Sequence, residues 1–161
     1  RIGQGSSFTV LFPVAETPLA LPASTPVQRV SAQGAGQRVM YVDDDEALVF
    51  LINRVLKRKG YQVLTFTDPR LAIAALRADP MQIDLLVTDY NMPGYSGVDL
   101  LRDVKAVRPG LPVALASGYV TPDIEQAALA AGARALIHKP NDVDELCDTV
   151  QRLLLQTKEP D

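Results

Sequence analysis

The feature of the sequence that most limits its fold is a series of short apolar runs separated by amphipathic segments. The runs cover residues 39–42, 61–66, 83–88, 111–116 and 133–137. Short apolar runs bounded by turn residues are typical of buried strands, and strands that alternate with helices form a parallel sheet. The sequence therefore predicts an α/β fold, a (βα)5 doubly wound five-stranded parallel sheet.

The segments between these runs carry the start and stop signals of helices. Residues 45–59 place apolar side chains on one face and end at Gly60, and residues 97–107 form a third such segment. Prolines that follow Asp68 and Thr121 mark two further helix starts. Asn141 is expected to cap a last helix that reaches about residue 156. Its leucines are expected to face largely inward, at positions 146, 153, 154 and 155.

Polar residues stand where the predicted strands stop. Asp43, Asp44 and Asp89 follow two of the apolar runs, while Ser117 and Lys139 follow two later ones. Ligands of open parallel sheets bind at the carboxyl ends of the strands, so all five side chains should meet at one rim. Three carboxylates there would repel one another, and a divalent cation with oxygen ligands would neutralise them. Asp89 then becomes a nucleophile that faces a metal ion.

These residues resemble the motifs of receiver domains in two-component response regulators. The resemblance covers residues 37–157 and rests on Asp43-Asp44, Asp89-x-x-Met92-Pro93-Gly94-x-x-Gly97, Ser117-Gly118 and Lys139-Pro140. It implies the flavodoxin/CheY-like fold and a place in a two-component phosphorelay. A phosphohistidine would donate its phosphoryl group to Asp89, and the domain would signal by a conformational change or pass the group onward. It would also hydrolyse its own phosphoryl group.

The resemblance also assigns roles to the residues at the rim. It implies Mg²⁺ bound by the carboxylates of Asp44 and Asp89 and by the backbone carbonyl of Asn91, with Asp43 acting through water. Lys139 would pair with Asp89 at rest and with a phosphoryl oxygen after transfer.

A conformational switch is implied by the same resemblance. Ser117 would donate to a phosphoryl oxygen and draw its loop inward. The family couples this movement to an aromatic residue three places before the lysine, but that place is Leu136 here. A packing shift of Leu136 would then have to carry the signal. Tyr119 is a candidate for shielding the phosphoryl group from water.

The first 36 residues differ from the rest, because they hold three charged residues and prolines at 13, 18, 22 and 26. Residues 3–13 resemble the closing strand of a histidine-kinase ATP-binding domain. We therefore expect a kinase remnant at 1–13, a linker at 14–36, the receiver domain at 37–157 and a tail at 158–161. The parent would be a hybrid histidine kinase whose catalytic core is absent from this chain. The alternative is a disordered or packing arm on a free-standing regulator.

Two other functions fit part of the pattern. An acidic pair after a strand also opens haloacid-dehalogenase-type phosphatases, in which Asp43 would be the nucleophile. Against this reading, Ala47 replaces the usual Thr or Val, and the motif that begins at Asp89 is left unexplained. The second alternative is a pseudo-receiver, a binding module with the fold but without phosphoryl chemistry.

Composition limits the partners. A net charge of −3 with scattered basic residues argues against nucleic acid, and no apolar stretch approaches the roughly 20 residues that span a bilayer. The single cysteine, Cys147, favours a cytoplasmic location, with any membrane anchor lying elsewhere in a parent kinase. The expected partners are a histidine kinase or a phosphotransfer domain. Residues 121–132 and the fifth strand are the expected contact for a partner or a homodimer.

Overall fold

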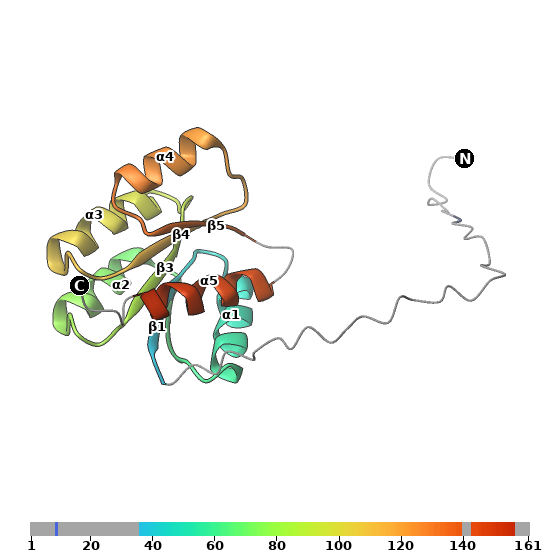
Figure 1. The fold of residues 1–161 in the computed structure, drawn as a ribbon, viewed down its shortest axis with the longest axis horizontal. Coiled ribbons are helices and arrows are strands. Elements are labelled where there is room, and N and C mark those ends of the chain that lie inside the picture. The colour runs from blue at the N-terminus through green and yellow to red at the C-terminus, as the bar shows by residue number, and fades with distance from the viewer. Residues whose placement is uncertain (1–8, 10–35, 140–142, 157–161) are drawn as a thin grey trace, which may run out of the picture.

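The computed structural model of the protein describes Thr9 and residues 36–139 and 143–156. Five strands and five helices alternate along this part of the chain (Figure 1). The strands are β1 (Arg38–Val42), β2 (Gln62–Phe66), β3 (Leu85–Asp89), β4 (Val113–Ser117) and β5 (Ala135–His138). The helices are α1 (Glu46–Arg58), α2 (Pro69–Ala78), α3 (Gly97–Val107), α4 (Pro122–Ala130) and α5 (Val143–Gln156).

The strands form one parallel sheet in the order β2-β1-β3-β4-β5. Helices α1 and α5 cover one face, and α2, α3 and α4 cover the other (Figure 1). The predicted (βα)5 doubly wound architecture is confirmed. Strand β1 lies beside β3, so the carboxyl ends of these two strands meet at the centre of one rim.

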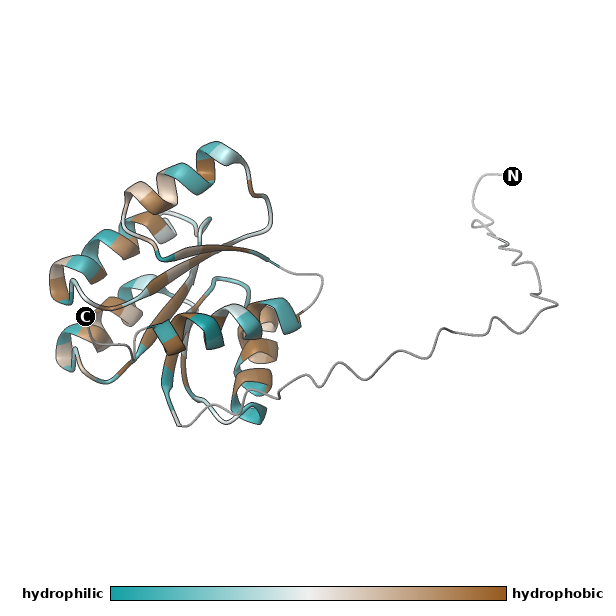
Figure 2. Ribbon diagram, viewed as in Figure 1, coloured by the Kyte–Doolittle hydropathy of each residue, from teal (hydrophilic) through white to brown (hydrophobic). Residues whose placement is uncertain are grey.

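Two apolar cores lie on the two faces of the sheet, because successive side chains of a strand point to opposite faces. Val39 and Tyr41 pack under α1 and α5, whereas Met40 and Val42 pack under the other three helices. Strands β3 and β4 are buried along their whole length. Apolar residues accordingly follow the strands and the inner faces of the helices (Figure 2).

Short polar side chains fix where the helices begin. Asp45 caps α1 by accepting hydrogen bonds from two backbone N–H groups, and Asp68 caps α2. Ser96 forms a reciprocal capping box with Asp99 at the start of α3, and Thr121 caps α4. Each cap satisfies backbone donors that have no partner inside the helix.

The prediction for α5 was wrong at one position. Leu146, Leu153 and Leu154 are buried, but Leu155 is 56% exposed, because each step along a helix turns the side chain by about 100°. None of the helices in the described ranges is long and apolar enough to cross a membrane. The expected kinase remnant, linker, tail and Asn141 cap concern residues outside the described ranges, Thr9 and Gly36 apart.

Candidate functional site

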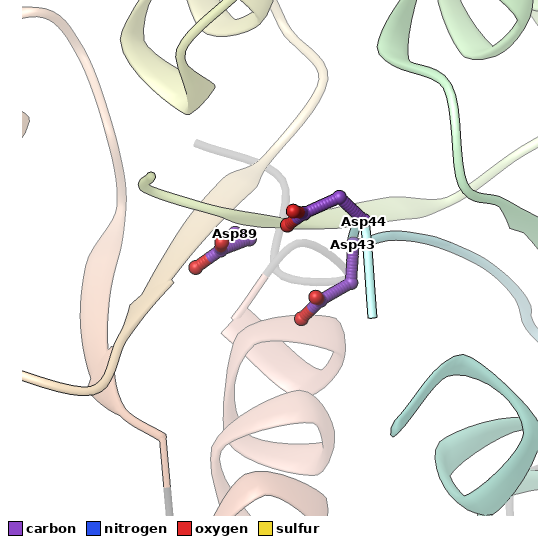
Figure 3. Close-up of side chains that lie close together, drawn as sticks. All are labelled: Asp43, Asp44 and Asp89. Atoms are coloured by element: carbon purple, nitrogen blue, oxygen red, sulfur yellow. The ribbon is translucent and has the colours of Figure 1, made fainter. Parts of the chain in front are cut away.

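Three carboxylates gather at the rim of the sheet. Asp43 and Asp44 directly follow β1, and Asp89 is the last residue of β3. Val42 of β1 lies opposite Thr88 of β3, so the residues after them are also neighbours. One oxygen from each of the three carboxylates lies within 4.8 Å of the other two, and Figure 3 shows the three side chains together. The structure therefore brings together the acidic residues that the sequence predicted.

Lys139 joins two of these carboxylates. Its Nζ lies 2.9 Å from Oδ2 of Asp43 and 3.0 Å from Oδ1 of Asp89. Lys139 follows β5, and the register places Ala116 of β4 between Asp89 and Ile137. A small side chain at this place on β4 leaves room for the lysine to cross that strand.

The alternation of strand side chains explains which polar residues meet. Asp43, Asp89 and Lys139 each lie two places after a residue that packs under α1 and α5, so all three point to that side of the sheet. Ser117 and Leu136 lie on the other side. Leu136 is partly buried there and pairs in register with Leu115.

Asp43 is fully buried and accepts three hydrogen bonds. Its Oδ2 accepts from Lys139 Nζ and, at 2.9 Å, from the hydroxyl of Tyr41, while its Oδ1 accepts from the backbone N–H of Asp45 at 3.0 Å. Sequence reasoning missed Tyr41. The signal was a phenol in the apolar run 39–42, two places before Asp43 and thus on the same face.

Burial and charge set the proton affinities at this site. Burial is the largest effect on Asp89 and raises its pKa. Lys139 lowers the pKa, the charge of Asp43 raises it, and the backbone N–H of Asn91 lowers it. The pKa of Asp89 remains above its ordinary value. Burial alone would lower the pKa of Lys139, but its two carboxylate partners outweigh that effect and raise it. The ammonium therefore stays protonated and holds Asp89 next to a fixed positive charge.

The loop from Asp89 to α3 is held by close backbone packing. The backbone N–H of Gly97 donates to the carbonyl of Tyr90 at 3.0 Å. A Cβ atom at Gly97 would lie 2.1 Å from the carbonyl oxygen of Asp89, so only glycine fits here. Met92 is buried among the residues under α2 and α3 and anchors the middle of the loop.

Ser117 is buried but its hydroxyl turns toward its own loop. The hydroxyl donates to the carbonyl of Tyr119 at 2.8 Å, and the backbone carbonyl of Ser117 accepts from the N–H of Lys139 at 2.6 Å. Tyr119 is 71% exposed. The hydroxyl of Ser117 is therefore satisfied within its own loop.

The donor set fits a hard divalent cation. Among the described residues, three carboxylates face one ammonium group at the rim, an excess of two negative charges. Asp44 is exposed, and within the described ranges its carboxylate has neither a hydrogen bond nor an ion pair. A hollow lined in part by Asp44, Met92 and Pro93 opens beside it. Oxygen ligands, excess negative charge and access from solvent are the conditions under which Mg²⁺ binds.

The chain is similar to known receiver proteins. A sequence model described as the response regulator receiver domain matches residues 39–151. The Sensory/regulatory protein RpfC of Xanthomonas campestris pv. campestris is 30% identical over 140 residues, 84% of this chain and 19% of that protein. Sporulation initiation phosphotransferase F of Bacillus subtilis is 27% identical over 118 residues, 73% of this chain and 94% of that protein.

The chain is also similar to solved structures of receiver domains. A CheY-like response regulator receiver domain protein from Methanospirillum hungatei JF-1 has a TM-score of 0.71 at 26% identity, over 77% of this chain and 98% of that one. The present chain spans about a fifth of the length of RpfC. With the family match over most of its sequence, the chain belongs to the response regulator receiver domain family of two-component systems.

Proposed function

We propose that Asp89 accepts a phosphoryl group from a phosphohistidine in a two-component phosphorelay, with Mg²⁺ bound by Asp44, Asp89 and the backbone carbonyl of Asn91. The observation that carries this proposal is the short distance from Nζ of Lys139 to Oδ1 of Asp89, which is 3.0 Å. Asp89, at the end of the central strand β3, thereby lies next to the fixed cation of Lys139. It also belongs to a group of three carboxylates suited to binding a second cation.

The transfer is an in-line displacement at phosphorus. A carboxylate oxygen of Asp89 attacks the phosphorus atom, the bond from phosphorus to the donor imidazole nitrogen breaks, and its electron pair stays on that nitrogen. Mg²⁺, when bound, offsets the charge on the phosphoryl oxygens. Lys139 supplies the remaining positive charge and passes from Asp89 to a phosphoryl oxygen. Asp43 would act on the Mg²⁺ through a water molecule rather than as a direct ligand.

We propose that Ser117 and Leu136 transmit the modification. The phosphoryl group adds about −1.5 to −2 charges and new acceptor oxygens, which favour turning the Ser117 hydroxyl away from the Tyr119 carbonyl. Ser117 and Leu136 share one side of the sheet, so Leu136 can repack toward space that the loop leaves.

Intact mass spectrometry tests the acceptor. The protein is incubated with acetyl phosphate and Mg²⁺, beside Asp89→Asn and beside Asp148→Asn, which removes an exposed carboxylate on α5. We expect a phosphoryl adduct in the parent and in Asp148→Asn that needs Mg²⁺, and none in Asp89→Asn. An adduct that persists in Asp89→Asn would assign the nucleophile to another residue, with Asp43 the first to test.

Neither alternative is favoured by the relatives. Membership of the receiver family opposes a haloacid-dehalogenase-type phosphatase. Asp43 is also fully buried and holds three donors, which is poor access for a nucleophile. A pseudo-receiver would lack one or more groups needed for phosphoryl chemistry, but the acidic residues and Lys139 are together here.

We further propose that the chain derives from a hybrid sensor histidine kinase and works in the cytoplasm with a histidine kinase or phosphotransfer partner. The match to RpfC covers 84% of the chain, more than residues 39–151 contain. Because only ten residues follow position 151, that match must include residues before 39. The proposed layout is a kinase remnant at 1–13, a linker at 14–36, the receiver at 37–157 and a tail at 158–161. Transfer from a purified, phosphorylated kinase core would test the partner.

A further inference from the structure

We infer that Tyr41 is a positioning residue for phosphoryl transfer: its hydroxyl holds the buried carboxylate of Asp43 and thereby leaves Lys139 free to serve Asp89. This inference rests on the proposed phosphoacceptor role of Asp89.

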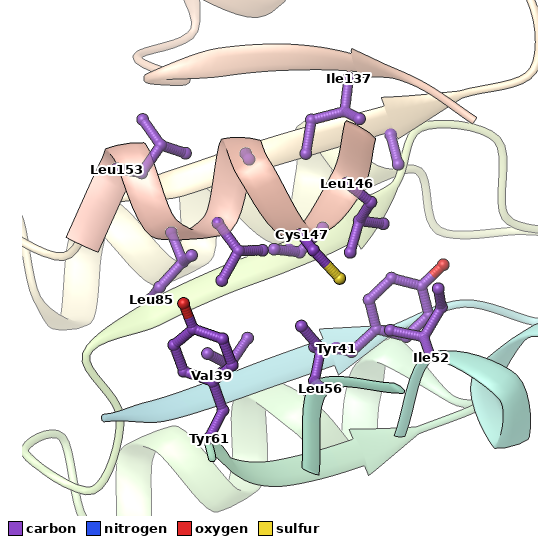
Figure 4. Packing of buried hydrophobic residues seen from close by; sticks show 14 of the residues in the cluster. Val39, Tyr41, Ile52, Leu56, Tyr61, Leu85, Ile137, Leu146, Cys147 and Leu153 are labelled. Carbon is purple, nitrogen blue, oxygen red and sulfur yellow. The ribbon is translucent and has the colours of Figure 1, made fainter. Parts of the chain in front are cut away.

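The contact is made between two fully buried side chains. The Tyr41 hydroxyl donates to Oδ2 of Asp43 at 2.9 Å, and neither residue is exposed to solvent. The ring of Tyr41 is packed in the core under α1 and α5, near Ile52 (Figure 4). A ring fixed on all sides holds its hydroxyl at one place, so the donor is preorganised and Asp43 can take only a narrow range of orientations.

The same oxygen of Asp43 also accepts from Lys139, at 2.9 Å. Tyr41 and Lys139 therefore share the negative charge of one oxygen. When Lys139 turns to a phosphoryl oxygen on Asp89, Oδ2 of Asp43 would, without the Tyr41 hydroxyl, lose its last donor among the described residues while it remains buried. A buried carboxylate oxygen without a donor is costly, so such a site would hold the lysine back.

Tyr41 removes that difficulty, because its hydroxyl stays with Asp43 throughout. The backbone N–H of Asp45 holds the other oxygen, at 3.0 Å. Asp43 thus keeps one donor on each oxygen after the lysine has moved. Without the hydroxyl, we expect phosphoryl uptake to slow about tenfold, the size expected for one lost hydrogen bond to a charged group.

Tyr61 offers a matched control. It is buried in the same core as Tyr41 but lies at the opposite end of it, near Leu85 (Figure 4). Within the described part of the chain its hydroxyl makes no hydrogen bond. Tyr61→Phe therefore removes the same atom from the same core without touching the acidic group.

The first experiment measures the rate of phosphoryl uptake from acetyl phosphate at saturating Mg²⁺ in the parent, Tyr41→Phe and Tyr61→Phe. We expect Tyr41→Phe to be slowed about tenfold and Tyr61→Phe to match the parent within about twofold. Equal rates for the two phenylalanine variants would overturn the inference while leaving Asp89 as the acceptor. A parent protein that takes up no phosphoryl group would overturn the proposed function itself.

The second experiment tests the contact without any phosphoryl chemistry. Urea unfolding is measured for Tyr41→Phe, Asp43→Ala and the double variant. If the hydroxyl acts through Asp43, the shift in the urea midpoint caused by Tyr41→Phe should largely disappear in the Asp43→Ala background. A shift of the same size in both backgrounds would show that Tyr41 contributes only general packing, and the inference would be wrong.

Discussion

Replacing Gly97 with alanine should destabilise the domain by about 3 kcal/mol or more, because a backbone group occupies the place of the new side chain. A Cβ atom at Gly97 would lie 2.1 Å from the carbonyl oxygen and 3.0 Å from the carbonyl carbon of Asp89, and 3.1 Å from Cδ2 of Leu115. The first contact is too short by about 1 Å. Leu115 can give way slightly, but the Asp89 carbonyl belongs to a buried central strand and cannot.

The magnitude follows from these contacts. Overpacking a well-packed core usually costs about 1–3 kcal/mol, and a clash with backbone belongs at the upper end of that range or beyond it. The better helix propensity of alanine offsets less than about 1 kcal/mol, because Gly97 is the first residue of α3. A net loss near 3 kcal/mol corresponds to a fall in Tm of ~10 °C or more for a domain of this size.

The assay is urea and thermal unfolding followed by far-ultraviolet circular dichroism, since the chain contains no tryptophan. Gly110→Ala is the control, because a Cβ atom there would have no neighbour within 4 Å. We expect Gly110→Ala to unfold close to the parent. If Gly97→Ala were as stable as Gly110→Ala, the close approach of α3 to Asp89 would not constrain the fold and the reasoning would be refuted.

Three further predictions concern other contacts. Asp84→Asn should lower stability by about 1 kcal/mol at pH 7, because Asp84 accepts from both the side chain and the backbone N–H of Arg38. Burial raises the pKa of Asp84, but Arg38 outweighs this and lowers it, so the difference in urea midpoint should persist above the ordinary aspartate pKa of about 4 and shrink as the pH falls below it. Asp68→Ala should cost about 1 kcal/mol in urea unfolding by removing the acceptor for the N–H of Arg70 at the start of α2; an unchanged midpoint would contradict this. Tyr119→Ala should lose its phosphoryl group faster than the parent if the exposed ring shields it, and an equal rate in a mass-spectrometric decay series would dismiss that role.

Much of the acidic site could be predicted from the sequence, because parallel strands bring their carboxyl ends to one rim whatever their order. Asp43, Asp44, Asp89 and Lys139 each lie within two residues of the end of an apolar run, and the structure gathers all four. The period of the apolar residues is a local property, set by backbone geometry alone. The helix caps at Asp45 and Asp68 are local in the same sense.

The partners of those residues could not be predicted in this way. That Lys139 binds Asp43 as well as Asp89 depends on β1 lying beside β3, and on the small residue Ala116 of β4 between Asp89 and Ile137. The hydrogen bond from Tyr41 to Asp43 depends on how α1 and α5 pack around the ring.

The sequence by itself therefore determined the elements, their alternation and the residues at the rim of the sheet. Only the tertiary structure decided which donor meets which carboxylate, as where Lys139 after β5 contacts both Asp43 and Asp89. The physical reason is range: backbone propensity and alternation act over a few residues, whereas hydrogen bonds between strands depend on strand order, register and the size of the side chains between them.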